Sequence, residues 1–313
     1  TISIERYHGE NVGFLNNIFP RFSSAELLEY FENLGVDFKE EEDGAVFPVT
    51  GQSSTILDIL LEELERWKVP VQLSSRIEKI RKENQNFILE AENKIFSCRK
   101  LVMASGGLTY PQLGSLPDGY EFAKSFGHRI IEPLPSLVGF EISNKSLFDL
   151  QGVKTMAEVK ALRNSKLCAK TTGEILFTHF GVSGPAVFYL SNFIIRDLTE
   201  NNTILKINFF PEKSPEEVEE KIMAVWASNP GRTLGNSLIG FLPKKIPQVL
   251  MRNILKLDIS KLPSQVTAKE RKALIKALTG LDIALTKPRP FSEAQITSGG
   301  IDTRENNPKT MEA

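Results

Sequence analysis

Apolar residues recur at helical spacing in several stretches of the chain, each opened by a residue type that begins helices. Ser23-x-x-Glu26 and Thr267-x-x-Glu270 are capping boxes, in which the first side chain and the carboxylate three residues later each accept a hydrogen bond from a free backbone N–H. Ser214 combines a capping residue with a following proline and two glutamates. The pattern therefore predicts helices that begin near these positions: Ser23, Ser54, Pro185, Ser214 and Thr267.

Short apolar and alternating runs predict strands between these helices. Residues 36–49 suggest a hairpin with its turn at Asp43-Gly44, and residues 69–73 suggest a further strand. Three runs then have the spacing of an antiparallel meander: 76–80, 87–91 and 94–98. From His128 to about Phe210 alternation dominates, which predicts a mostly β region.

The stretch from Leu101 to Gly127 has the order of elements that presents backbone to a ligand in an open α/β sheet. The apolar run Leu101–Ala104 predicts a strand, Ser105-Gly106-Gly107 ends it, and Asp118-Gly119 precedes a short helix. Paired glycines remove two Cβ atoms, so that a flat or phosphorylated ligand could touch the main chain. The alternative interpretation is a tight turn with no ligand.

Composition places the chain among ordinary globular proteins. It has 313 residues, of which 41% are hydrophobic and 25% charged, and no apolar run approaches the roughly 18 residues of a membrane helix. Two separated cysteines, Cys98 and Cys168, and three scattered histidines argue against a disulfide framework and against a metal site. We expect a cytoplasmic protein. Because the chain begins at Thr1 and has no GxGxxG before Leu101, we interpret it as an internal piece of a longer protein.

Charge is distributed unevenly along the chain. Residues 232–290 contain 12 Lys/Arg and 3 Asp/Glu, a net charge of +9, whereas the whole chain has a net charge of −1. A basic region can attract phosphorylated ligands or nucleic acid. These lysines alternate with helix-spaced leucines, however, and no set of stacking aromatic residues accompanies them, which favours a solvated helical face.

Eight segments in the same order resemble those of a known family, the BaiN-like flavoproteins, also called aminoacetone-oxidase-like NAD(P)/FAD-dependent oxidoreductases. FTHFGVSGP and ITSGGI are the most specific of them in combination. The segments are GAVFPVT (44–50), LVMASGG (101–107), DGYEFAKSFGH (118–128), LPSLVGF (134–140), GEILFTHFGVSGPAV (173–187), LPKK (242–245), AQITSGGI (294–301) and KTME (309–312).

The resemblance implies an FAD-binding domain of the glutathione-reductase type, interrupted by a β-barrel-like domain and a small helical domain. On this basis we expect four regions: 1–131 and 287–313 from a partial FAD-binding domain, 132–211 from the mostly β domain and 212–286 from the basic helical domain. The resemblance also implies FAD as the cofactor and NAD(P)H as a candidate co-substrate. Relative to the family pattern, the chain lacks the GxGxxG unit and the final glycine-rich FAD segment. It also has Ser105 in place of a threonine and Leu116-Pro117 before Asp118.

The candidate site residues follow from these motifs. We expect Ser105, Gly106, Gly107, Asp118 and Gly119 to lie beside FAD, with Arg76 and Ile77 near the adenine. Thr297, Ser298, Gly299 and Gly300 are candidates to approach the isoalloxazine ring, and Gly181, Ser183 and Gly184 form a helix start that favours an anion. His179 is the candidate acid/base or substrate-positioning residue. The alternatives are tight turns, an ordinary capped helix and a structural histidine.

The expected function is that of an FAD-dependent oxidoreductase. Hydride would pass between NAD(P)H or a small organic substrate and the flavin. An ene-reductase or amine oxidase is the nearest alternative enzyme, and a nucleic-acid-binding or scaffold protein with a flavin fold is the alternative from another class. Because the phosphate-binding GxGxxG motif is absent, we expect this chain alone to retain FAD poorly.

Overall fold

The chain forms two compact units in a computed structural model that describes residues 4–41, 44–198 and 202–313. Unit 1 comprises Thr1–Ala104, Asp118–Ile131 and Ile301–Ala313, and unit 2 comprises Ser105–Pro117 and Glu132–Gly300. Each unit is described by itself.

Unit 1 contains three α-helices, a hairpin and a meander. The capping box predicted at Ser23 is present and begins α1, which confirms that helix start. The hairpin β1–β2 is antiparallel, and the meander β3–β4–β5 is formed as predicted. The elements are α1 (Ser24–Asn33), β1 (Phe38–Glu40), β2 (Val46–Pro48), α2 (Ser54–Arg66), β3 (Ile77–Glu83), β4 (Asn86–Ala91), β5 (Lys94–Cys98) and α3 (Asp118–Ser125), with 3-10 turns at Ile4–Arg6, Val12–Asn17, Phe19–Arg21 and Thr303–Glu305.

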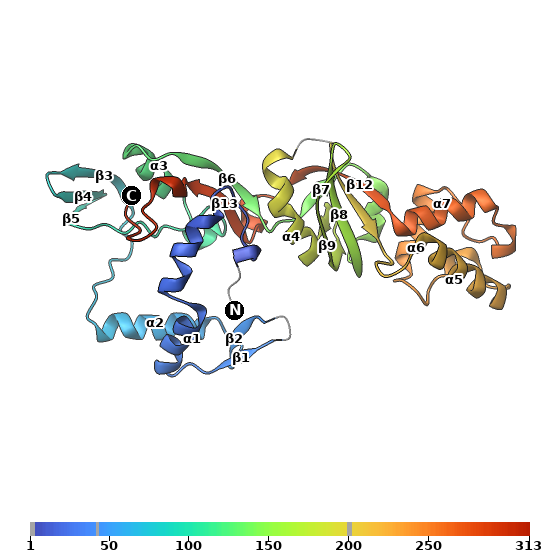
Figure 1. Cartoon of the computed structure of the whole chain (residues 1–313), viewed down its shortest axis with the longest axis horizontal. Coiled ribbons are helices and arrows are strands. Elements are labelled where there is room, and N and C mark those ends of the chain that lie inside the picture. Colours follow the sequence, from blue (N-terminus) through green and yellow to red (C-terminus); the bar gives the residue numbers. More distant parts are fainter. Residues whose placement is uncertain (1–3, 42–43, 199–201) are drawn as a thin grey trace. The chain divides into compact units, whose positions relative to one another are not determined.

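Unit 2 is built around a closed antiparallel barrel of six strands in the order β10-β7-β12-β11-β8-β9. In Figure 1, α4 lies beside β9, and α5, α6 and α7 form a helical group that joins the barrel through α7. The barrel strands are β7 (Phe140–Ile142), β8 (Lys154–Arg163), β9 (Lys166–Phe177), β10 (Gly181–Ser183), β11 (Thr203–Asn208) and β12 (Leu281–Pro288). The helices are α4 (Pro185–Ile194), α5 (Pro215–Ser228), α6 (Lys245–Val249) with a π turn at Leu250–Ile254, and α7 (Ala268–Thr279).

Several short elements complete the chain. Strands β6 (Ile130–Ser136) and β13 (Ile296–Ile301) form a separate two-stranded sheet. Six 3-10 turns also occur after residue 104 and before β13: Pro111–Leu113 (η4), Lys145–Leu150, Ile195–Asp197, Leu234–Asn236, Pro263–Gln265 and Phe291–Glu293 (η10).

The main hydrophobic core lies in unit 2 and follows the two-residue period of its strands. Along β11, every second side chain is buried, and Leu205 faces Ala161 of β8 and Ile283 of β12 in the ladder. The inward side chains of the strands, such as Ala157, Val159 and Ala161 of β8, fill the barrel interior, as in other small barrels. The core continues into α4 and the helical group, so the predicted β and helical regions share one core.

Unit 1 buries far fewer apolar side chains. Its buried hydrophobic residues among those described are Val36, Ile80 and Ala123. The predicted apolar side of α2 is present, but Leu57, Leu61 and Trp67 are exposed on it. Unit 1 therefore holds its elements mainly through local hydrogen bonds and ion pairs rather than through a core.

Two predicted strands are wrong. Residues 69–73 and Leu101–Ala104 form no strand, and Val102 is 86% exposed. An apolar run becomes a strand only when a neighbouring strand bonds its backbone, and no strand pairs with either run among the described residues.

The structure also contains a strand that the sequence analysis assigned to the helical region. Leu281–Pro288 is β12, and its inward residues alternate along the barrel. The hairpin of residues 36–49 is confirmed, whereas its predicted turn residue Asp43 lies outside the described residues.

Candidate functional site

The loop that follows Ser105 is held against Thr297 within unit 2. The Thr297 hydroxyl accepts hydrogen bonds from the backbone N–H of Leu108 at 2.7 Å and of Thr109 at 3.3 Å. A Cβ atom at Gly107 would lie 2.5 Å from Thr297 Oγ1, which no side chain could tolerate. The structure thus brings two predicted cofactor segments, 105–107 and 297–300, into direct contact, and Gly107 has a packing reason for being glycine.

Gly106 differs from its neighbour because space beside it is open. Its φ of +75° lies in the left-handed region that favours glycine, and a Cβ there would meet only Ser115 Oγ, at 3.9 Å. Gly299 and Gly300 also have positive φ angles, 97° and 115°. An exposed turn of bare backbone at Gly106 fits the approach of a flat cofactor such as a flavin.

The segment 181–184 has a structural role in the barrel. A Cβ at Gly181 would clash with the carbonyl oxygen of Phe140, and one at Gly184 would lie 2.9 Å from that of Glu174. Ser183 was predicted as part of the start of α4, and this is wrong: Ser183 is the last residue of β10, and Gly184 is the N-cap of α4 without a side-chain bond. The carbonyl of Gly184 accepts the first helical bond, from Phe188 N.

His179 is exposed on the loop before β10 and belongs to a charged cluster that the sequence analysis missed. Its ring packs edge-on against Phe180, with the ring centroids 5.1 Å apart. The guanidinium carbon of Arg289 lies 4.4 Å from the centroid of the Phe180 ring. Arg289 bonds Glu141 at 2.7 Å and Glu293 at 2.6 and 3.0 Å.

The cluster has an electrostatic consequence at Glu293. Hydrogen bonds from Arg289 hold the pKa of this carboxyl below its ordinary value, although partial burial acts in the opposite direction; His179 adds a smaller lowering effect. His179 thus lies close enough to Glu293 to act on this carboxyl. Glu141 and Arg289 are 148 positions apart in the sequence, which explains why no sequence motif revealed the group.

In unit 1, Arg76, predicted near the adenine, and Asp118, predicted beside FAD, bind each other. Arg76 Nε and Nη2 donate to the two carboxylate oxygens of Asp118 at 2.8 and 2.9 Å, a bidentate pair that lowers the pKa of Asp118. Ile77 begins β3, and the buried Gly119 follows Asp118 in the first turn of α3. The pair joins the meander to α3, and both partners are satisfied without a ligand.

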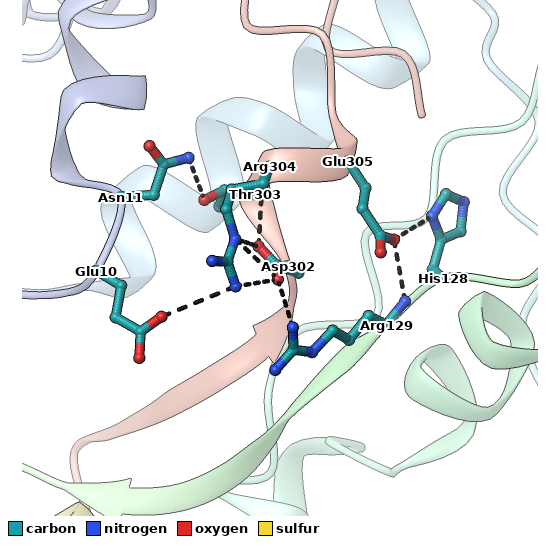
Figure 2. Close-up of polar contacts among 8 residues, drawn as sticks. All are labelled: Glu10, Asn11, His128, Arg129, Asp302, Thr303, Arg304 and Glu305. Atoms are coloured by element: carbon teal, nitrogen blue, oxygen red, sulfur yellow. Dashed lines mark hydrogen bonds and ion pairs between the residues drawn. The ribbon is translucent and has the colours of Figure 1, made fainter.

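A second network in unit 1 surrounds a buried carboxylate, Asp302 (Figure 2). Arg304 donates to both of its oxygens, at 2.6 to 3.1 Å, and these bonds are the main reason that the pKa of Asp302 falls to about 2. Arg129 lies 4.0 Å away, and the backbone N–H of Asp302 donates to the Arg129 carbonyl.

Neighbouring side chains extend this network on two sides (Figure 2). Glu10 lies 3.8 Å from the Arg304 guanidinium, and Glu305 accepts from the Arg129 N–H and pairs with His128. The network fixes the segment after Gly300 to the turn before β6. Sequence reasoning missed Asp302, because an isolated acidic residue gives no sign that it will be buried.

Metal-binding clusters, disulfides and membrane-spanning helices are all absent from the described part of the chain. Its histidines, cysteines and carboxylates form no group of three or more that could bind a metal. Cys98 and Cys168 are both free. No helix within the described ranges has the length and apolar character needed to cross a membrane.

Comparison with known proteins shows similarity along almost the whole chain. The family model described as the HI0933-like protein Rossmann domain matches residues 2–313. The 3-dehydro-bile acid delta(4,6)-reductase of Clostridium scindens is 30% identical over 98% of this chain and 75% of its own length. The ribosomal RNA dihydrouridine synthases of Escherichia coli and Haemophilus influenzae are each 28% identical, over 98% of this chain and 74% of their own lengths. The chain thus spans about three quarters of the length of these relatives.

Proposed function

The chain belongs to the HI0933-like family of FAD-dependent Rossmann proteins, and from this premise we propose that it is the core of an oxidoreductase that transfers hydride from NAD(P)H through FAD to a small organic substrate. The family contains flavin-dependent reductases. The open backbone at Gly106, within a loop bonded to Thr297, is the observation that carries the proposal for this chain.

The proposed architecture assigns the FAD-binding domain to residues 1–131 and 287–313. The barrel region 132–211 and the helical region 212–286 would then be insertions that shape the substrate side. Support comes from the closed barrel and from the mixed α/β content of the Rossmann-type family, whereas residues 105–117 and 287–300 group with the barrel in unit 2.

In this proposal the cofactor is held chiefly by backbone. Ser105, Gly106 and Gly107 would line one side of FAD, and Thr297 to Gly300 the side near the isoalloxazine ring. FAD, when bound, supplies the hydride-accepting and hydride-donating chemistry. The protein's own contribution is a fixed turn: the Thr297 hydroxyl satisfies two amides that would otherwise face the ligand. Arg76 and Ile77 stay proposed contacts near the adenine, and Asp118 and Gly119 stay proposed contacts beside FAD.

The substrate class is proposed from the chemistry that the relatives' names share. One relative reduces a bile acid that carries double bonds and an oxidised 3-position; the others form dihydrouridine in ribosomal RNA. Both descriptions suggest reduction of a carbon–carbon double bond conjugated with a carbonyl. We propose such a bond as the target, with His179 as acid/base residue, its position supported by Phe180 and the nearby Glu293.

A second candidate function is nucleic-acid binding without redox activity. The observation that favours it is the basic region, in which Lys269, Lys272 and Lys276 are exposed on one face of α7. Affinity for RNA that falls steeply with salt, in a protein without flavin, would support this candidate.

The test of the flavin proposal is retention of FAD by a Gly106→Ala variant. An alanine methyl would occupy the open side, so we expect weaker FAD binding in flavin-fluorescence titrations. Because the left-handed φ also strains alanine, thermal unfolding is measured in parallel. Gly240→Ala, where a Cβ also meets open space and the backbone is not left-handed, is the matched control. Equal FAD affinity in Gly106→Ala and in the parent protein would contradict the assignment.

A further inference from the structure

Tyr110, which follows the two residues that bond Thr297, has an unfavourable backbone conformation. Tyr110 has a φ of +56°, in the left-handed region that residues with large side chains seldom adopt. Of the other described non-glycine residues with positive φ, Lys68 and Lys256 follow helix ends, and Asn84, Asn164 and Ser165 lie in hairpin turns; Ser74, Leu137 and Met311, like Tyr110, have neither setting. Tyr110 differs from these three in that the two residues before it are both bonded to the Thr297 side chain.

The neighbours of Tyr110 account for how this conformation is maintained. Thr109 and Leu108, immediately before it, donate their N–H groups to Thr297. Pro111, immediately after it, has a fixed φ and begins the 3-10 turn η4, in which Leu113 N donates to the Tyr110 carbonyl at 2.8 Å. The turn η4 packs against η10, only a few residues before Thr297. Thr297 therefore anchors the backbone of the two residues that precede Tyr110.

Packing of the side chain does not explain the strain. Tyr110 is 41% exposed, so burial of its ring does not offset the free-energy cost of the unfavourable backbone conformation. Strained residues that persist in this way occur where a side chain must be presented to a ligand. Tyr110 is four residues from Gly106, whose open side is the proposed flavin contact.

We propose that Tyr110 is a substrate-contacting residue that donates a hydrogen bond from its phenol to the carbonyl of the substrate, and that Thr297 is the residue that positions it. This inference rests on the proposed function. A hydrogen bond to the carbonyl oxygen withdraws electron density from the conjugated double bond and stabilises the negative charge that develops there as hydride arrives. The phenol keeps its proton in this role, so no proton transfer is assigned to it.

The test separates the two half-reactions in protein purified with its flavin. Tyr110→Phe keeps the ring and the strained backbone but loses the hydroxyl. We expect flavin reduction by NADH or NADPH at the parental rate, and reoxidation by the probe 2-cyclohexen-1-one slowed on the order of 10²-fold. Tyr189→Phe is the matched control, because Tyr189 is also 41% exposed in unit 2.

The positioning role is tested at Thr297. Thr297→Ser keeps the accepting oxygen, and we expect its reoxidation by the enone to be faster than that of Thr297→Val. Thr297→Val keeps the shape but leaves the Leu108 and Thr109 amides without their acceptor, and we expect reoxidation to slow as in Tyr110→Phe. A protein with Tyr110→Gly, which relieves the left-handed strain, should melt at a higher temperature while its reoxidation is slow.

Three results would overturn the inference: parental reoxidation in Tyr110→Phe, equal rates in the serine and valine variants of Thr297, or a Tyr110→Gly protein with an unchanged or lower melting temperature. Failure of the proposed function has a different signature. A parent protein without flavin, or one whose reduced flavin the enone does not reoxidise, would remove the substrate role of Tyr110. The melting temperatures of the Tyr110→Gly and Thr297 variants would still decide whether Thr297 holds a strained residue.

Discussion

At the scale of single residues, the structure explains several glycines and charges by contacts between distant parts of the chain. Gly107 is glycine because Thr297 occupies the space of its side chain, and Arg289 is paired because Glu141 and Glu293 flank it. The motifs indicated that the glycine segments matter. They could not show which glycine faces a side chain and which faces open space, since that depends on residues about 190 positions away.

Asp302 gives a residue-scale prediction about pH. Its folded-state pKa of about 2 lies below the unfolded value of about 3.9, so its contribution to stability is complete above the unfolded value and is lost as pH falls toward the folded one. Replacing Asp302 with Asn should therefore lower the melting temperature of unit 1 at pH 6.

The pH series supplies the control for this variant. The difference in melting temperature between parent and Asp302→Asn should shrink as pH falls from about 4 toward about 2, because the parent carboxylate then becomes protonated. A difference that is the same at pH 6 and at pH 2.5 would show that the charge of Asp302 is not what stabilises the segment.

At the scale of elements, helices were predictable and several strands were not. The helix starts at Ser23, Ser214 and Thr267 depend on bonds within four residues, and all three capping boxes are present. Strands depend on partners elsewhere. Leu101–Ala104 has no partner strand among the described residues, whereas Leu281–Pro288 pairs with β7 and β11 and closes the barrel.

The capping box of α7 yields an element-scale prediction. The Thr267 hydroxyl accepts a hydrogen bond from the Glu270 N–H, and the Glu270 carboxylate accepts one from the Thr267 N–H. Thr267→Ala should lower the free energy of unfolding by about 1 kcal/mol, because it leaves a backbone donor at the helix start without its acceptor. Urea unfolding measures this, with Ser264→Ala as a control at an exposed serine that does not cap α7. Equal losses in the two variants would contradict the capping role.

At the scale of the molecule, the two units differ in how much apolar surface they bury. The barrel and its helices hold the continuous core, whereas unit 1 leaves α2 residues such as Leu57, Leu61 and Trp67 exposed. Hydrogen exchange should therefore be slowest in β8, β9 and β11 and faster throughout α1 and α2. Uniform protection across both units would contradict this difference.

The same comparison predicts binding of a hydrophobic dye. Exposed apolar patches larger than a few hundred Å² are uncommon on isolated globular proteins and bind such probes. We expect 8-anilinonaphthalene-1-sulfonate fluorescence to rise with this chain and to fall in a Leu57→Ser, Leu61→Ser variant; a Met156→Ser variant, at an exposed barrel residue, is the control. Equal fluorescence in the parent and the α2 variant would place the dye elsewhere.

The central claim is that the protein is a flavin-dependent reductase, and one anaerobic titration tests it most directly. The protein is purified at its natural full length from the cells that make it, its visible spectrum is recorded, and NADH or NADPH is added in steps. We predict the absorption of oxidised flavin, its loss on reduction, and release of FAD on acid denaturation. A colourless protein that yields no FAD and binds none when it is added would contradict the account.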